Sequence, residues 1–238
     1  MNIDKKYYQE INENLTNTIQ DTNISAPNKK VGKVRDAYFL NDKVVMISTD
    51  RQSAFDRVLA AIPYKGAVLN SVSAWWFKKT EHLFPNHLIS TPDPNVSIVE
   101  KCTVFPVEFV VRGYITGTTD TSLWTVYNNG DREYCGNSLP EGLKKNDKLD
   151  KPMLTPTTKD KVHDRPVSRE EIIDLGLMSA EDYDLAAKMS LDLFAFGQET
   201  AKKNGLILVD TKYEIGTDSK GKIKFVDEIH TPDSSRFW

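Results

Sequence analysis

Cysteine is scarce in this 238-residue chain, which contains only Cys102 and Cys135. Two cysteines, with no CxxC pair and no Cys/His cluster, argue against a small module held by disulfides and against a structural zinc site. They are typical of a reducing compartment. The N-terminus also lacks an apolar core segment, so neither a signal peptide nor a membrane anchor is expected. We therefore expect a cytoplasmic protein.

An excess of charge of one sign is also missing. The net charge is -3, from 31 basic and 34 acidic residues, so no global field would recruit nucleic acid or an anionic membrane. Any anionic ligand must be held by local charge. Nothing in the chain matches GxGxxG or GxxxxGK[ST], which argues against a Rossmann domain and a P-loop.

What the chain does contain is enough apolar sequence, 39% of residues, for one large domain or two intimate lobes. Its patterns predict strands over 30–40 and 43–49, a helix over 71–83, paired strands over 96–104 and 107–115, and a long helix between Ser179 and Gly205. The loop-rich stretch 128–166 suits either a substrate lid or disorder. Strands first, helices later and then a hairpin predict an α+β fold with largely antiparallel sheets.

Charged residues gather near the C-terminus, where two apolar segments predict a hairpin around a turn at Asp218–Gly221. This turn places Lys212 opposite Asp227 and Glu214 opposite Phe225. Alternation then puts one lysine and three carboxylates on a single face: Asp210, Lys212, Glu214 and Asp227. The acidic excess favours a bound divalent cation, and oxygen ligands suit Mg²⁺. A solvated hairpin face is the alternative.

Two basic features can hold an anion. Lys33 and Arg35 follow Gly32 in the first predicted strand, where residues two apart share a side and the glycine lets a phosphate approach the backbone. An ordinary surface hairpin is the alternative. Arg112 stands in an apolar strand and needs an anionic partner, because an unpaired buried charge is costly. That partner is either Glu108 or a substrate carboxylate or phosphate.

Several motifs in fixed order carry a resemblance to a known family. They are Gly32-Lys33-Val34-Arg35-Asp36, Ser53-Ala54-Phe55-Asp56, Pro106-Val107-Glu108-Phe109-Val110-Val111-Arg112, the segment 206–216, and Asp227-Glu228 followed by Thr231-Pro232-Asp233-Ser234-Ser235-Arg236-Phe237-Trp238. From about Gly32 to its C-terminus the chain resembles the SAICAR synthetase family. Several motifs that match together are far more specific than any single one.

The resemblance implies an ATP-dependent carboxylate–amine ligase of de novo purine biosynthesis. Such an enzyme joins carboxyaminoimidazole ribonucleotide to L-aspartate and releases ADP and phosphate, with Mg²⁺ as cofactor. It also implies two lobes with flanking helices and an ATP cleft between them. We expect residues 1–105 to carry the ATP-phosphate hairpin, and residues 106–238 to carry the substrate and magnesium sites. Relatives usually continue beyond the position of Trp238 with a further helical segment.

The resemblance further implies a role for each matching residue. The expected catalytic residues are Lys212, Asp210 and Arg236. The expected ATP contacts are Lys33, Arg35 and Glu108, and the expected magnesium ligands are Glu214 and Asp227. The expected substrate contacts are Arg112, Thr118, Asp233, Ser234, Arg236, Ser53 and Asp56. Thr118 replaces a serine often found at its position. The segment Thr155–Lys159 is expected to help close the site and shelter a reactive acyl phosphate.

Two other classes of protein share parts of this pattern. A small-molecule kinase would also use an Asp-x-Lys strand, carboxylate-held Mg²⁺ and a basic hairpin. A regulatory module could bind Mg-ATP on the same acidic hairpin without turning it over. Dependence of ADP release on aspartate separates the ligase from both. The expected partners are small molecules, and the sequence leaves a homo-oligomer open.

Overall fold

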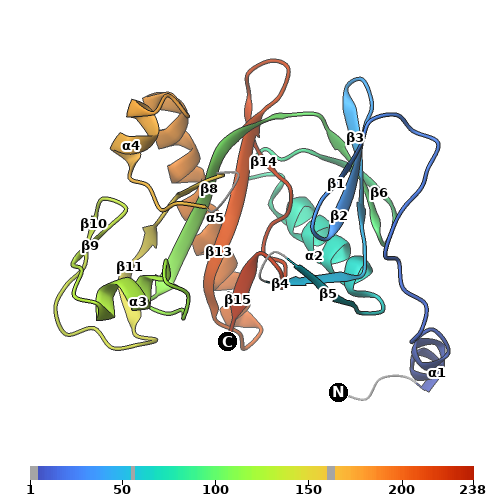
Figure 1. The fold of residues 1–238 in the computed structure, drawn as a ribbon, viewed down its shortest axis with the longest axis horizontal. Helices are drawn as coiled ribbons and strands as arrows, with labels where there is room; N and C mark the ends of the chain where they lie inside the picture. Colours follow the sequence, from blue (N-terminus) through green and yellow to red (C-terminus); the bar gives the residue numbers. More distant parts are fainter. Residues whose placement is uncertain (1–4, 55–56, 160–163) are drawn as a thin grey trace. The chain divides into compact units, whose positions relative to one another are not determined.

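The computed structural model describes residues 5–54, 57–159 and 164–238. These residues form helices and strands in two compact units (Figure 1). One unit comprises the chain up to Lys78 together with His87–Lys101, and the other comprises Lys79–Asn86 together with Cys102–Trp238. Every strand pair of the named elements is antiparallel, which confirms the predicted α+β class. Within the described part of the chain, no helix has the length and apolarity needed to cross a membrane.

The first unit is built on a five-stranded sheet with the order β1-β2-β3-β7-β6. Its strands are β1 (Lys29–Val31), β2 (Arg35–Phe39), β3 (Lys43–Ser48), β6 (Leu88–Asp93) and β7 (Val96–Glu100). A separate hairpin pairs β4 (Arg51–Ala54) with β5 (Arg57–Ala61), and the helices are α1 (Lys5–Glu13) and α2 (Lys65–Thr80). The buried side chains of this unit include Tyr38, Val44, Ile47, Leu69, Trp76, Phe77 and Val99.

Two sequence predictions for this unit were wrong. The chain reverses direction between β1 and β2, so residues 30–40 are not one strand. Helix α2 begins at Lys65, not at residue 71. The first turn of the helix contains Gly66, where a Cβ atom would lie 2.2 Å from the carbonyl oxygen of Ser48. The glycine therefore allows the first turn of α2 to pack against the end of β3.

The second unit is built on a six-stranded sheet. Its central path is β11 (Lys148–Leu154), β8 (Thr103–Tyr114), β13 (Leu208–Thr217) and β14 (Ile223–Val226), while β12 (Thr157–Thr158) pairs with β8 and β15 (Ser235–Phe237) pairs with β13. Long helix α5 (Ala180–Lys203) packs along β8 and β13 (Figure 1). The remaining elements are α3 (Leu123–Asn128), β9 (Glu133–Tyr134), β10 (Asn137–Ser138) and α4 (Arg169–Asp174).

The predicted pairing of strands 96–104 and 107–115 was wrong. The first forms β7, which pairs with β3 and β6, and the second belongs to β8 in the other unit. Pro106 reads as a strand break, yet it lies inside β8, where the register with β13 shifts between Glu214 and Gly216. Proline lacks an N–H group and is tolerated at such an irregularity.

The boundaries of α4 and α5 coincide with local capping residues. Ser168 caps α4 in a reciprocal capping box with Glu171. Ser179 caps α5, and Gly176 and Gly205 adopt φ values of 67° and 74° just after helix ends. The stretch 128–166 is not a structureless loop, because its described residues form β9, β10, β11 and β12.

Candidate active site

A chain of alternating charges lies across the centre of β8 and β13. The strand register places Glu108 directly opposite Glu214, two carboxylates that would repel each other. Lys212 separates their charges, with its Nζ atom 2.9 Å from Glu214 Oε1 and 3.2 Å from Glu108 Oε1. Lys159, which follows β12, contacts the other oxygen of Glu214. Two carboxylates and two ammonium groups thus form one partly buried cluster.

The pKa of Lys212 shows which charges act on this cluster. Burial by itself lowers the pKa, but the charges of Glu214, Asp227 and Glu108 outweigh burial and raise it well above the usual value. Lys212 therefore stays protonated at physiological pH. The charges of Glu214 and Asp227 thus both act on the same ammonium group.

The predicted register of the last hairpin was wrong by one residue. Glu214 pairs with Val226, not with Phe225, and β14 ends there. Asp227 follows in the left-handed region, with a φ of 65°. The simple strand alternation therefore does not extend to Asp227, whose charge nevertheless acts on Lys212.

A second cluster surrounds Asp210, which lies two residues before Lys212 in β13. Arg236 binds its carboxylate through two atoms, with Nε 2.9 Å from Oδ1 and Nη2 2.5 Å from Oδ2. Arg112 approaches the same carboxylate, with Nη1 3.7 Å from Oδ2, and its Nε donates to Thr155 Oγ1 at 2.9 Å. Two guanidinium groups and one carboxylate leave one net positive charge.

These contacts decide which carboxylate accompanies Arg112. Of the internal partners, Glu108 is bound to Lys212, and Asp210 approaches the guanidinium. Burial lowers the pKa of Arg112, and the charge of Asp210 opposes that effect. Because Asp210 is shared with Arg236, the pairing still leaves positive charge for an anionic ligand.

The C-terminal segment is tied to the same strand. The backbone N–H of Lys212 donates to the carbonyl oxygen of Ser234 at 3.0 Å, and Ser234 Oγ accepts from the N–H of Thr231 at 3.2 Å. Asp233 is exposed at the neighbouring position, and Thr118 is exposed in the segment after β8. The segment thus carries Arg236 onto β13, where β15 pairs Arg236 with Asp210.

The remaining predicted residues lie in the first unit. Gly32 N–H donates to the carbonyl oxygen of Arg35 at 2.7 Å, which closes a tight turn between β1 and β2. Lys33 is therefore in the turn and Arg35 begins β2, so they are not two positions of one strand as predicted. Ser53 lies in β4, while Asp56 lies outside the described residues.

Sequence reasoning did not predict the contacts of Thr155, Lys159 and Arg51. It placed Thr155 and Lys159 in a lid, whereas the structure places them against Arg112 and Glu214. The signal for Lys159 was its place in a Thr-Pro-Thr-Thr-Lys stretch, which does not name a partner. It also missed Arg51, whose buried guanidinium binds the turn at Gly32 and Lys33.

Comparison with known proteins gives the family of the chain. The family model described as SAICAR synthetase matches residues 28–238. A phosphoribosylaminoimidazole-succinocarboxamide synthase of Legionella pneumophila (strain Lens) is 59% identical over 220 residues, which cover 92% of this chain and 70% of that protein.

Solved structures give the same result for the fold. A SAICAR synthase from Saccharomyces cerevisiae, complexed with SAICAR, superposes with a TM-score of 0.81 at 33% identity, over 92% of this chain and 79% of that chain. A type-2 SAICAR synthetase in complex with ADP gives a TM-score of 0.75 at 28% identity, over 89% and 84%. The chain therefore belongs to the SAICAR synthetase family, the ATP-dependent ligases that join carboxyaminoimidazole ribonucleotide to L-aspartate in de novo purine biosynthesis.

Proposed function

We propose that the two charged clusters on β8 and β13 carry out the ligation. The observation that supports this most is the Arg112–Asp210–Arg236 cluster, set one alternation from the Glu108–Lys212–Glu214 cluster on the same strand pair. One cluster has net positive charge for an anionic substrate, and the other has carboxylates for a cation.

The remaining roles follow the motif positions. Lys33 and Arg35 bind ATP phosphates, and the strand up to Glu108 lines the adenine site. The residues that contact the ribonucleotide are Arg112, Thr118, Ser53, Asp56, Asp233, Ser234 and Arg236. Residues 1–105 supply the phosphate hairpin, and residues 106–238 supply the rest. The location that we propose is cytoplasmic, and the partners are small molecules.

The chemistry requires activation of a carboxylate, which is a poor acyl donor because it would have to expel oxide. A carboxylate oxygen attacks the γ-phosphorus of ATP, the bond to the β-phosphate oxygen breaks, and ADP leaves. The aspartate amine then attacks the acyl carbon, phosphate leaves with the former carboxylate oxygen, and the nitrogen loses a proton. Lys212 stays protonated, so it stabilises developing negative charge and does not act as the base.

Glu214 and Asp227 suit a magnesium ion whose remaining ligands come from phosphate and water. Their charges act together on Lys212, and carboxylate oxygens are ligands that Mg²⁺ prefers. In the described parts of the chain, no group of three or more His, Cys, Asp or Glu side chains is placed to hold a metal alone. A pair of carboxylates fits Mg²⁺, which takes its other ligands from water and phosphates. When bound, the ion neutralises charge on the polyphosphate.

Replacement of Glu214 by glutamine tests the metal role. We expect Glu214→Gln to fold normally but to need about tenfold more Mg²⁺, or more than that, for half-maximal rate. The measurement is a magnesium titration of initial rate at saturating ATP. Glu199→Gln is the matched control, because Glu199 is an exposed carboxylate paired with Lys203 at 2.8 Å on α5. Superimposable titrations for the two variants would exclude Glu214 as a ligand.

Oxygen transfer tests the acyl phosphate. Carboxyaminoimidazole ribonucleotide with ¹⁸O in its carboxylate is incubated with ATP, Mg²⁺ and aspartate, and the released phosphate is analysed by mass spectrometry. The proposed path transfers one ¹⁸O atom to phosphate in each turnover. Unlabelled phosphate would rule out the path.

Omission of aspartate separates a ligase from a kinase. It should reduce ADP release to a small residual rate, whereas a kinase would release ADP without aspartate.

A further inference from the structure

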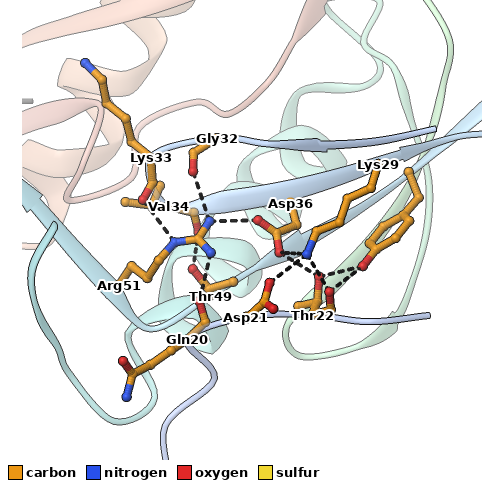
Figure 2. Close-up of polar contacts among 11 residues, drawn as sticks. Gln20, Asp21, Thr22, Lys29, Gly32, Lys33, Val34, Asp36, Thr49 and Arg51 are labelled. Atoms are coloured by element: carbon orange, nitrogen blue, oxygen red, sulfur yellow. Dashed lines mark hydrogen bonds and ion pairs between the residues drawn. The ribbon is translucent and has the colours of Figure 1, made fainter. Parts of the chain in front are cut away.

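An arginine in the first unit is buried against the turn that joins β1 and β2. Arg51 begins β4, and the whole residue is 8% exposed. Its guanidinium donates to the carbonyl oxygens of Lys33 at 3.1 Å, Gly32 at 3.0 Å and Gln20 at 2.8 Å, and to Asp36 Oδ1 at 2.8 Å. Figure 2 shows these contacts, with the side chain of Lys33 extending away from Arg51. One side chain thus holds two consecutive peptide groups of the turn.

Asp36 compensates the buried charge of Arg51. Its side chain is fully buried, and its other oxygen accepts from Thr22 Oγ1 at 2.7 Å and lies 3.0 Å from Lys29 Nζ. Burial alone would raise the pKa of Asp36, but hydrogen bonds from Arg51, Thr22 and Lys29 lower it overall. The carboxylate therefore stays charged and fixes the guanidinium in place.

The third carbonyl group of the turn is held in the same way. The carbonyl oxygen of Val34 accepts from Thr49 N–H at 2.9 Å and from Thr49 Oγ1 at 2.8 Å. The carbonyl groups of residues 32, 33 and 34 are therefore all bound by neighbouring groups. The peptide bonds of the described chain are all trans, and in a planar trans peptide the N–H group points opposite to the carbonyl.

The orientation of these peptide groups has a chemical use. The N–H groups of Lys33, Val34 and Arg35 point away from Arg51 and Thr49. Successive N–H groups in a turn form a site for a phosphate oxygen, and the cationic side chains of Lys33 and Arg35 add charge at the same turn. Gly32 cannot be replaced easily, because a Cβ atom there would lie 2.8 Å from the carbonyl oxygen of Arg35.

We propose that Arg51 is a positioning residue that sets the peptide groups of the Gly32–Arg35 turn for the phosphates of ATP. This proposal rests on the proposed role of the turn in binding ATP phosphates. Arg51 acts through the backbone and need not touch the nucleotide. To hold all four acceptors, residue 51 needs a planar guanidinium group. Lysine keeps the positive charge but cannot donate to all four acceptors in this geometry.

Arg51→Lys separates positioning from charge. Calorimetry with ATP and with ADP should show dissociation constants raised about tenfold or more, because a misplaced turn loses aligned contacts. Saturation-transfer NMR with adenosine, which has no phosphate, should show binding within twofold of wild type. Tyr38→Phe is the matched control: it removes a hydroxyl bound to Thr22, at the far end of the same network, and should change none of these values.

Two more variants make every outcome decisive. Thr49→Val keeps the shape of a buried residue and removes the hydroxyl bound to Val34, so it should weaken ATP binding about threefold even if Arg51→Lys fails to fold. Lys33→Ala tests the turn itself. If Lys33→Ala weakens ATP binding but Arg51→Lys and Thr49→Val do not, positioning is wrong. If Lys33→Ala has no effect, the proposed phosphate role of the turn is wrong. Equal loss of ATP and adenosine binding in Arg51→Lys would also overturn the proposal, because it indicates general damage.

Discussion

Asp210 is the residue on which the positive cluster depends. A single buried carboxylate lies between Arg112 and Arg236, so neither guanidinium is fully neutralised. The two arginines differ in exposure: 12% of the side chain of Arg112 is exposed, compared with 44% for Arg236. Arg112 is therefore largely enclosed by the strand around it, and Arg236 is the more exposed of the two guanidinium groups.

Removal of Arg236 should affect turnover far more than folding. We expect Arg236→Ala to lower kcat/KM by roughly 100-fold, about 2.7 kcal/mol, on the scale of one lost charge stabiliser. Its half-exposed ion pair should contribute no more than about 1 kcal/mol to the free energy of unfolding. Steady-state kinetics and urea unfolding of the same preparation measure both values.

The chain offers a matched arginine for this experiment. Arg169 also binds a carboxylate through two atoms, with distances of 2.7 and 2.8 Å to Asp184, on the exposed surface. Arg169→Ala should retain activity within twofold of wild type. If Arg236→Ala stayed within threefold as well, its pair with Asp210 would be only a surface ion pair.

At the scale of elements, the junction of β8 and β13 depends on a glycine. A Cβ atom at Gly216 would lie 2.6 Å from the carbonyl oxygen of Thr103 and 3.0 Å from the Cα atom of Val104. Both contacts are with backbone, which cannot move aside as a flexible side chain can. We expect Gly216→Ala to lower the free energy of unfolding by about 1–3 kcal/mol, measured by urea unfolding. A change below about 0.5 kcal/mol would mean that β8 shifts freely.

The turn between β13 and β14 should give a pH-dependent contribution to stability. Asp218 accepts from the N–H groups of Lys220 and Lys222, both at 2.9 Å, and these contacts together with Lys224 lower its pKa from 3.8 to about 2. A lowered pKa stabilises the fold above the unfolded-state value and loses that effect as pH falls through the folded-state value.

Asp218→Asn tests this linkage because asparagine keeps an acceptor oxygen but no charge. The variant should be less stable than wild type at pH 7, and the difference in free energy of unfolding should shrink between about pH 4 and pH 2. Urea unfolding at a series of pH values measures it. A difference that is constant over this range would show that the charge of Asp218 contributes nothing.

Sequence patterns predicted the elements better than their partners. Helix ends and the Asp218 turn follow from local residue preferences, so α5 and the two strands of the last hairpin were predicted closely. The register of that hairpin was wrong by one residue, because the turn geometry, which sets the register, depends on hydrogen bonds that Asp218 accepts from the N–H groups of Lys220 and Lys222. Strand partners were also wrong: β7 pairs with β6 just before it and with the more distant β3, while β8, its neighbour in sequence, pairs with β13 about a hundred residues later.

At the scale of the whole molecule, the bound nucleotide and metal should stabilise the fold together. ATP at about 100 times its dissociation constant adds about 2.7 kcal/mol, which raises the thermal midpoint by about 5–10 °C in a chain of this size. We expect this gain with ATP and Mg²⁺, and we expect EDTA to remove most of it. Differential scanning fluorimetry measures both midpoints.

The ligand-free protein provides the control for this measurement. In the part of the chain that the structure describes, three or more potential ligands never gather at one point. EDTA alone should therefore leave the thermal midpoint unchanged. A lower midpoint in EDTA would reveal a metal that belongs to the fold itself.

The molecule as a whole also shows what motifs can and cannot predict. Motif order indicated the family and brought Arg112, Asp210 and Arg236 to one place, as the structure confirms. It did not indicate that Lys159 binds Glu214 or that Arg51 binds the Gly32 turn. Those contacts join segments that share no pattern, so only the folded chain brings them together.

The pairing of β8 with β13 also has a consequence for how the chain folds while it is being synthesised. Glu108 and Lys212 are 104 positions apart, so the ribosome makes β8 long before its partner. Until then, this edge of β8 has no hydrogen-bonding partner, and the apolar row of Val107, Phe109 and Val111, fully buried in the finished protein, also lacks helix α5, which packs on β8. Sheets whose strands are far apart in sequence form slowly, and their folding intermediates expose apolar surface that is prone to aggregation. We therefore expect the nascent chain to bind chaperones until β13 has been synthesised.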